Sequence, residues 1–184
     1  MLEGRFARGA GAAFAALACA LAAACAADPD LLSADDRAAL DPDRCLAAGL
    51  DWRSGSLTEF ESYPDPGSEE CVEFSGCEYV GEFAACAGKK SEEWVAAHHI
   101  AAVFPDFDAL ALHDLCLRAG DSYLVVTVLD ACNDDDCDGC CTENLGDAEQ
   151  LVDLEKYTLA AWGVEDGGGV EWADLGPTQG GGCD

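Results

Sequence analysis

The ten residues Tyr123-Leu124-Val125-Val126-Thr127-Val128-Leu129-Asp130-Ala131-Cys132 give the clearest structural signal in this chain. The first seven are β-branched, aromatic or leucine, a composition typical of strands. They predict a strand over 123–129 that is buried on both faces. The segment before it, Arg-Ala-Gly-Asp-Ser over 118–122, has turn composition, so we expect a hairpin with a strand over 110–117.

Shorter patterns on both sides of this hairpin predict more strands than helices. The apolar stretch 94–104, which ends at Pro105, fits either a strand or a helix. Residues 151–162 have helical spacing and are followed by Gly163, which predicts a helix. Alternating or β-branched residues beside turns predict further short strands over 57–63, 72–74, 78–83 and 170–175. The expected fold class is mainly β, a small barrel with one or two short helices.

The charge of the chain excludes several classes of partner. Nine lysine and arginine residues stand against 37 aspartate and glutamate residues among 184 residues, which gives a net charge of −28. Such a surface repels phosphate backbones and anionic lipid, so we expect no nucleic-acid partner. Anionic wall polymers are repelled for the same reason, whereas a neutral or cationic partner is not. Half of the residues are hydrophobic, which excludes a disordered acidic tail.

The N-terminus has the pattern of a secretory signal peptide. Arg5 and Arg8 precede an apolar run over 9–24, and small residues follow at cleavage spacing. We therefore expect residues 1–24 to be a signal peptide, the protein to be secreted, and residues 25–56 to form an acidic N-terminal segment. The sequence before Cys25 also loosely matches a lipoprotein box, so lipid anchoring at Cys25 is the alternative. No other segment predicts a transmembrane span.

Twelve cysteines are a high number for this length. Ten of them follow residue 25, and an even number in an oxidising compartment predicts a disulfide framework. The sequence leaves their pairing open. The candidates are Cys45, Cys71, Cys77, Cys86, Cys116, Cys132, Cys137, Cys140, Cys141 and Cys183.

Four segments, taken in order, resemble those of the expansin-like, barwin-related proteins, which include rare lipoprotein A-like domains. Trp94-Val95-Ala96-Ala97 is similar to an early strand of the family, and residues 125–132 match its pattern V-x-V-x-D-x-C. Residues 151–157 stand in the place of its helix start, and residues 169–172 are similar to its closing V-x-W strand. The resemblance implies a six-stranded double-psi β-barrel over 57–176, stapled by disulfides. The residues that follow, 177–184, form a Gly-rich tail.

The resemblance also implies where a site lies. In that family an Asp after the central strand and an Asp at the helix start meet in an open groove, and here these are Asp130 and Asp153. Expansin-like members bind and loosen wall polysaccharide without hydrolysis, so this is the expected function. The alternative is a glycan-cleaving enzyme of the endoglucanase or lytic transglycosylase type that uses Asp153 with Asp130. Each Asp also has a structural interpretation, as a helix cap for Asp153 and a turn residue for Asp130.

Three further residues are candidates for contact with a sugar. Trp94 and Tyr157 offer aromatic faces for stacking, although aromatic residues at such spacing also suit a core. His98 and His99 are adjacent, so at most one of them enters a groove if they lie on a strand. The glycan-binding candidates are therefore Asp130, Asp153, Tyr157, Trp94 and His98.

The acidic, cysteine-rich segment 133–143 is a candidate calcium loop. It contains the pattern D-x-D-x-D-G, but its glutamate stands two positions short of EF-hand spacing. The alternatives are a solvated loop pinned by disulfides and zinc bound by cysteines. A secreted, acidic, Ca²⁺-dependent interaction module is thus the third function considered, whereas the other two require no cofactor, and we expect a monomer. The metal candidates are Asp134, Asp136, Asp138 and Glu143.

Overall fold

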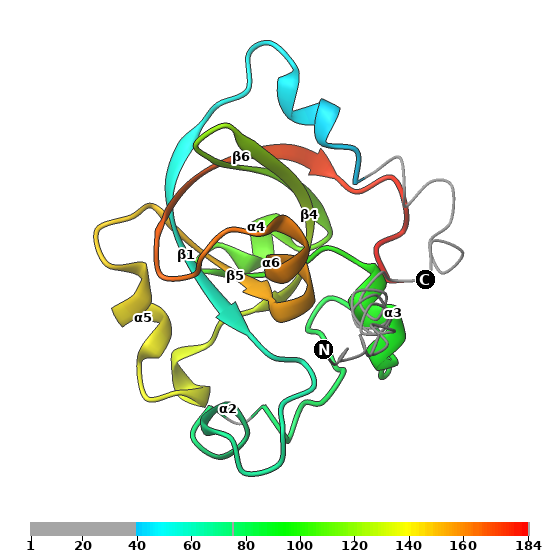
Figure 1. The fold of residues 1–184 in the computed structure, drawn as a ribbon, viewed down its shortest axis with the longest axis vertical. Coiled ribbons are helices and arrows are strands. Elements are labelled where there is room, and N and C mark those ends of the chain that lie inside the picture. Colours follow the sequence, from blue (N-terminus) through cyan, green and yellow to red (C-terminus); the bar gives the residue numbers. More distant parts are fainter. Residues whose placement is uncertain (1–39, 75, 184) are drawn as a thin grey trace, which may run out of the picture.

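The computed structural model describes residues 40–74 and 76–183 (Figure 1). The predicted signal peptide at 1–24 and the lipid-anchor candidate Cys25 lie outside these residues. Within the described ranges, no helix has the length and hydropathy of a membrane span. The elements, in chain order, are η1 (Pro42–Leu46), β1 (Arg53–Phe60), α2 (Glu69–Val72), α3 (Glu92–Ala97), β2 (Ile100–Phe104), α4 (Phe107–Leu110), β3 (His113–Ala119), β4 (Ser122–Ala131), η2 (Asp134–Asp136), α5 (Cys140–Leu145), β5 (Gln150–Glu155), α6 (Lys156–Trp162) and β6 (Gly169–Pro177).

Six strands of the described chain close into one barrel. Their order around it is β1-β5-β2-β4-β3-β6, and β6 pairs with β1 to complete the ring. The pairs β1/β5 and β2/β4 are parallel, whereas the remaining pairs are antiparallel. The prediction of a mainly β, six-stranded barrel with short helices is confirmed.

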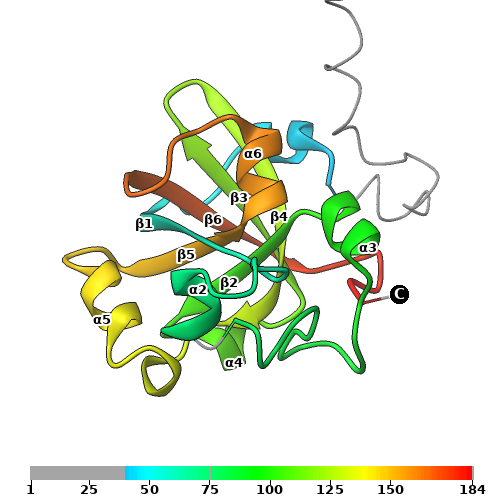
Figure 2. The same ribbon diagram turned by 60° about the horizontal axis from the view of Figure 1, so that its bottom comes forward.

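The strand order contains an internal twofold. If β1 is exchanged with β4, β2 with β5 and β3 with β6, every strand keeps the same kinds of neighbour around the barrel. The exchange also turns the parallel pair β1/β5 into the other parallel pair, β2/β4. The helices follow the same rule, because α4 connects β2 to β3 and α6 connects β5 to β6. These two helices lie at opposite ends of the barrel in Figure 2, and each contributes a leucine, Leu110 and Leu159, to the core. The two halves of the chain thus contribute equivalent parts to the barrel.

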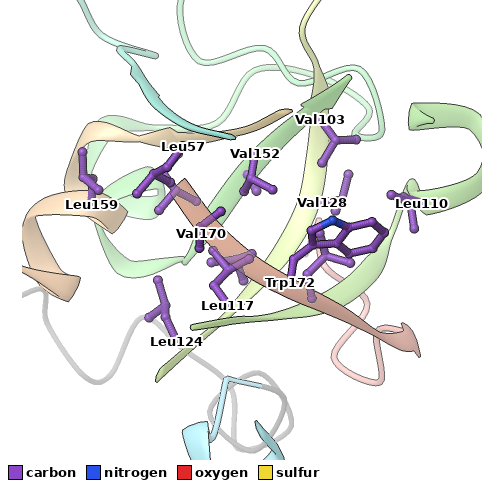
Figure 3. Packing of buried hydrophobic residues seen from close by; sticks show 14 residues of the cluster. Leu57, Val103, Leu110, Leu117, Leu124, Val128, Val152, Leu159, Val170 and Trp172 are labelled. Carbon is purple, nitrogen blue, oxygen red and sulfur yellow. The ribbon is translucent and has the colours of Figure 1, made fainter. Parts of the chain in front are cut away.

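The barrel interior is filled by apolar side chains from all six strands. They alternate along each strand, because successive strand residues point to opposite faces. Figure 3 shows them pointing into one shared interior. Full burial of one such aliphatic or aromatic side chain stabilises the fold by roughly 1.5–3 kcal/mol. The strand residues of this core are Leu57, Ala101, Val103, Leu115, Leu117, Leu124, Val126, Val128, Val152, Leu154, Val170 and Trp172.

Strand β4 is buried on both faces, as its composition predicts. Val126 lies in the barrel interior, while its neighbour Val125 packs outside the barrel against the Cys45–Cys116 disulfide. Both valines have no exposed surface. The predicted hairpin before β4 is also confirmed, since β3 and β4 are antiparallel neighbours.

All ten candidate cysteines form disulfides, so the predicted framework is confirmed. Two of the bridges join segments 71 and 97 residues apart, and long loops constrain the unfolded chain most. One of these long bridges ties the Gly-rich tail back to the rest of the structure. The pairs are Cys45–Cys116, Cys71–Cys77, Cys86–Cys183, Cys132–Cys141 and Cys137–Cys140.

Three predictions of secondary structure are wrong. The strand expected at 72–74 is replaced by the short helix α2, which Ser68 caps by accepting a hydrogen bond from the backbone N–H of Cys71. Residues 78–83 form turns instead of a strand. The helix expected from residue 151 begins only at Lys156, because residues 150–155 pair with β1 and β2 as strand β5. This pairing overrides the local helical spacing.

The ambiguous stretch 94–104 contains both kinds of structure. Its first part belongs to α3, which Ser91 caps through a hydrogen bond from the N–H of Trp94, and its last part is β2. The match of Trp94-Val95-Ala96-Ala97 to an early strand of the family is therefore wrong, because these residues are helical. His98 stands at the end of the helix, not on a strand.

Candidate functional site

An open groove of about 650 Å³ lies beside the barrel. Its floor includes one residue from each of four strands: Thr58 of β1, Asp153 of β5, Ala102 of β2 and Asp130 of β4. Residues of α2 and of the loop after it line a second part, and residues within the segment 132–144 line a third. Figures 1 and 2 both place α2 and α5 on the same side of the barrel.

The four floor residues form one row across adjacent strands. Asp153 is the register partner of both Thr58 and Ala102, and Ala102 is also the partner of Asp130. Because neighbouring strands lie about 4.8 Å apart, the Cα atoms of the two aspartates are about 10 Å apart. The small side chain of Ala102 leaves room between the two carboxyl groups. The structure therefore brings together the two acids that the sequence predicted.

A β-bulge places Asp130 on the groove side of the barrel. Ala101 pairs with Val128, but Ala102 pairs with Asp130, so Leu129 is an extra residue on β4. In a regular strand Asp130 would share the inward face of Val128, which belongs to the core. The bulge reverses this alternation, and the carboxyl group of Asp130 lines the groove.

Asp153 keeps its proton up to about neutral pH. Desolvation is the main reason that its pKa rises from 3.8 to about 7, and the charges of Glu70 and Asp130 raise this pKa further. The hydroxyl of Thr58 donates a hydrogen bond of 2.8 Å to Oδ1 of Asp153, which opposes the rise by stabilising the charged form. Near pH 7 this side chain both donates and accepts hydrogen bonds.

Asp130 is held in place by the backbone. The N–H groups of Ala84 and Ala131 each donate a hydrogen bond of 3.0 Å to its Oδ1. Burial raises the pKa of Asp130 from 3.8 to about 6, although these two hydrogen bonds limit the rise. At pH 7 Asp130 is therefore mostly ionised, whereas Asp153 is about half protonated. The structural interpretations of the two acids are wrong, because Asp130 lies within β4 and Asp153 within β5, and the residue that caps α6 is Glu155.

Four further carboxylates of the groove were not among the residues predicted from the sequence: Glu59, Glu61, Glu70 and Glu82. The charges of Glu70 of α2 and Glu59 of β1 raise the pKa of Asp153. Burial raises the pKa values of both glutamates as well, and neighbouring acids add to this effect. Ser68, which follows the Pro66-Gly67 turn, is a residue type that commonly caps the start of a helix. No local pattern indicates that this helix lies beside the barrel acids.

Three predicted glycan-binding residues lie outside the groove. The rings of Trp94 and His98 stack with centroids 3.7 Å apart, and Nδ1 of His98 is hydrogen-bonded to the carbonyl oxygen of Trp94. The hydroxyl of Tyr157 on α6 donates a hydrogen bond to Glu92 of α3. These side chains join α3 and α6 in a cluster outside the barrel core. Their positions support packing rather than contact with a ligand in the groove.

Of the four aromatic side chains in the groove lining, two are exposed. Phe74 and Tyr79 follow α2 and are 38% and 51% exposed. An exposed aromatic face beside polar groups is suited to stacking on the apolar face of a sugar ring. Both residues fall in segments that were predicted to be strands, 72–74 for Phe74 and 78–83 for Tyr79.

Two adjacent disulfides pin the acidic loop beside the groove. In addition to the bonds Cys132–Cys141 and Cys137–Cys140, the sulfur of Cys141 lies 3.9 Å from the sulfurs of Cys137 and Cys140. Zinc would need free thiolates, and all four sulfurs are used in these bonds. The interpretation as a loop pinned by disulfides is therefore confirmed.

The calcium candidates of this loop do not converge. The carboxylate of Asp134 accepts hydrogen bonds from the backbone N–H and the hydroxyl of Thr142, which lower its pKa. Within residues 40–74 and 76–183, the only compact sets of three potential ligands include disulfide-bonded cysteines. The described part of the chain thus has no carboxylate cage formed by Asp134, Asp136, Asp138 and Glu143.

No protein-family model matches this chain, and no curated protein sequence matches it.

Proposed function

We propose that this protein is a secreted, expansin-like protein that binds a polysaccharide chain in the groove without hydrolysing it. The observation that carries the proposal is the row of Thr58, Asp153 and Asp130 on the floor of an open groove. Five disulfides favour an oxidising compartment outside the cytosol. The chain acts in this proposal without a cofactor.

The proposal includes a double-psi topology for the barrel. Its support is the internal twofold, which exchanges the parallel pair β1/β5 with the parallel pair β2/β4. The same operation relates α4 to α6 at the two ends of the barrel. Residues that resemble the family motifs, Asp130 and Asp153, then occupy β4 and β5, on either side of β2.

The groove supplies two kinds of contact for sugar rings. Asp153 and Asp130 present carboxyl oxygens to hydroxyl groups, and at pH 7 the protonated fraction of Asp153 also donates a hydrogen bond. Phe74 and Tyr79 supply exposed aromatic faces for stacking. A volume of about 650 Å³ lies within the range of small-molecule sites, so several sugar units of a longer chain fit.

Polysaccharide cleavage is the second candidate, and the two carboxyl groups favour it. Near pH 7 one is half protonated and the other is mostly ionised, which are the states that a general acid and a general base need. Against this, Oδ1 of Asp130 already accepts two backbone hydrogen bonds, which leaves only Oδ2 for the activation of water. Binding without cleavage is therefore the function proposed.

Retention on insoluble polysaccharide tests the binding. We expect the protein to be retained on at least one of cellulose, chitin and peptidoglycan, and retention to fall in Asp153→Asn. The matched control is Asp138→Asn, which removes one charge from an exposed residue outside the groove and leaves retention unchanged. Asparagine tolerates the positive φ of this position. Absence of retention on all three materials contradicts the proposal.

Release of reducing ends distinguishes binding from cleavage. We expect no release from the polysaccharide that retains the protein. Release that disappears in Asp153→Asn but persists in Asp138→Asn would instead establish the second candidate, with Asp153 as the acid.

A further inference from the structure

We propose, on the basis of the polysaccharide-binding function above, that the polymer bound in the groove carries free amino groups. The ligand is then a cationic amino-sugar polymer, such as a β-linked chain of glucosamine units. The feature that leads to this inference is the one-sided charge of the groove lining, combined with its exposed aromatic residues.

The charged residues of the groove lining all have the same sign. Within the described residues, seven carboxylates line the groove and no lysine or arginine does. One of them, Glu61, is paired with Lys156, which lies outside the lining and bonds Glu61 at 2.9 Å. The remaining six are Glu59, Glu70, Glu82, Asp130, Asp136 and Asp153.

These carboxylates repel one another inside the groove. The charges of Glu59, Glu70 and Asp130 all raise the pKa of Asp153, and the charges of Glu61 and Glu59 raise that of Glu70. Ammonium groups placed among them would relieve this repulsion, whereas a neutral chain would not. An anionic chain would add to the repulsion. The lining thus selects by charge among polysaccharides that fit the same groove.

The aromatic residues indicate a ring-shaped ligand rather than an inorganic cation. Phe74 and Tyr79 are exposed in the same lining as the carboxylates. An amino-sugar ring has an apolar face for stacking and an equatorial ammonium group for a carboxylate. A small inorganic cation would use only the carboxylates and leave the aromatic faces bare.

The overall charge of −28 attracts any polycation, so the test must separate the groove from the rest of the surface. The groove variant is Glu59→Gln/Glu70→Gln/Glu82→Gln, which leaves the row of Thr58, Asp153 and Asp130 intact. The surface variant removes the same three charges from exposed glutamates outside the lining, Glu143→Gln/Glu149→Gln/Glu165→Gln. Thermal unfolding of both variants checks that each is folded.

Calorimetric titration at 0.15 M NaCl and pH 7 compares a glucosamine hexamer, its fully N-acetylated form and a neutral glucose hexamer, all β-1,4-linked. We expect the glucosamine hexamer to bind at least tenfold more tightly than either neutral hexamer. The groove variant should lose at least tenfold in affinity for it, and the surface variant less than twofold. The groove variant should keep its affinity for the neutral hexamers, since these carry no ammonium groups to pair with the three substituted glutamates.

Two outcomes overturn this inference alone. Equal affinity of the protein for all three hexamers would leave polysaccharide binding standing but remove the preference for amines. Equal losses in the groove and surface variants would show that attraction is spread over the whole surface. If none of the three hexamers binds, this inference fails, and retention on cellulose, chitin and peptidoglycan then decides separately whether the proposed function stands.

Discussion

Replacing Asp153 by asparagine should change how the stability of the protein depends on pH. The native carboxyl group titrates near pH 7, whereas in the unfolded chain it titrates near 3.8. Between these values the native state holds a proton that the unfolded state has lost. The free energy of unfolding of the wild type therefore falls as pH rises through this window, and full stability is present only below it. Asparagine is neutral throughout and keeps an oxygen that accepts from Thr58.

The size of the effect follows from the shift of about three pH units. Each unit of difference between the native and unfolded pKa of Asp153 corresponds to about 1.4 kcal/mol of stability. Ionising Asp153 therefore costs the native state about 4 kcal/mol at pH 8. This value is an upper bound, because the side chain is in partial contact with solvent. We expect Asp153→Asn to match the wild type near pH 4 and to be more stable than it by 2–4 kcal/mol, an approximate range, at pH 8. Asp130 and Glu155 have pKa values raised to about 6 and about 7, so the variant still loses some stability as pH rises.

Urea unfolding at several pH values between 4 and 8, followed by tryptophan fluorescence, measures this effect. Trp172 is 3% exposed and reports the loss of the barrel core. Asp138→Asn, at an exposed position, should follow the wild-type curve. Parallel curves for the wild type and Asp153→Asn would refute the argument, because they would show that Asp153 titrates alike in the native and unfolded states.

Three further changes have defined expectations. Thr58→Val removes the hydroxyl that stabilises ionised Asp153, so NMR titration should show a higher pKa for that carboxyl group; an unchanged pKa would contradict the bond. Glu155→Ala removes the acceptor for the N–H of Tyr157 at the start of α6, and urea unfolding at pH 6 should show a loss of about 1–3 kcal/mol. Replacing Cys45 and Cys116 together by serine should lower the unfolding free energy by about 4 kcal/mol, since their loop spans 71 residues.

A matched control for the last change is the removal of the bridge Cys137–Cys140, whose cysteines are only three residues apart. The same loop-entropy relation gives about 1.6 kcal/mol for this bridge. Equal losses from the two bridges would show that loop length does not govern their contributions.

Several features of the molecule could be predicted from local sequence. The buried strand β4, the hairpin before it and the strand β6 are recognisable because β-branched composition and turn residues act over a few positions. The use of the ten cysteines in disulfides follows from their number. The predicted helix from residue 151 failed at its first turn, because pairing with two distant strands outweighs local spacing there.

The composition and local patterns of this chain were enough to predict an acidic, disulfide-rich β protein, whereas Asp130 and Asp153 were singled out only by the resemblance of four segments to the expansin-like proteins. The side of the barrel that Asp130 occupies depends on the bulge at Leu129, which exists only in the register of β2 against β4. The placement of Glu70 and the aromatic residues after α2 beside these acids likewise depends on contacts between segments far apart in the chain. Such contacts are set by packing and strand pairing in three dimensions, and no local stretch of sequence carries that information.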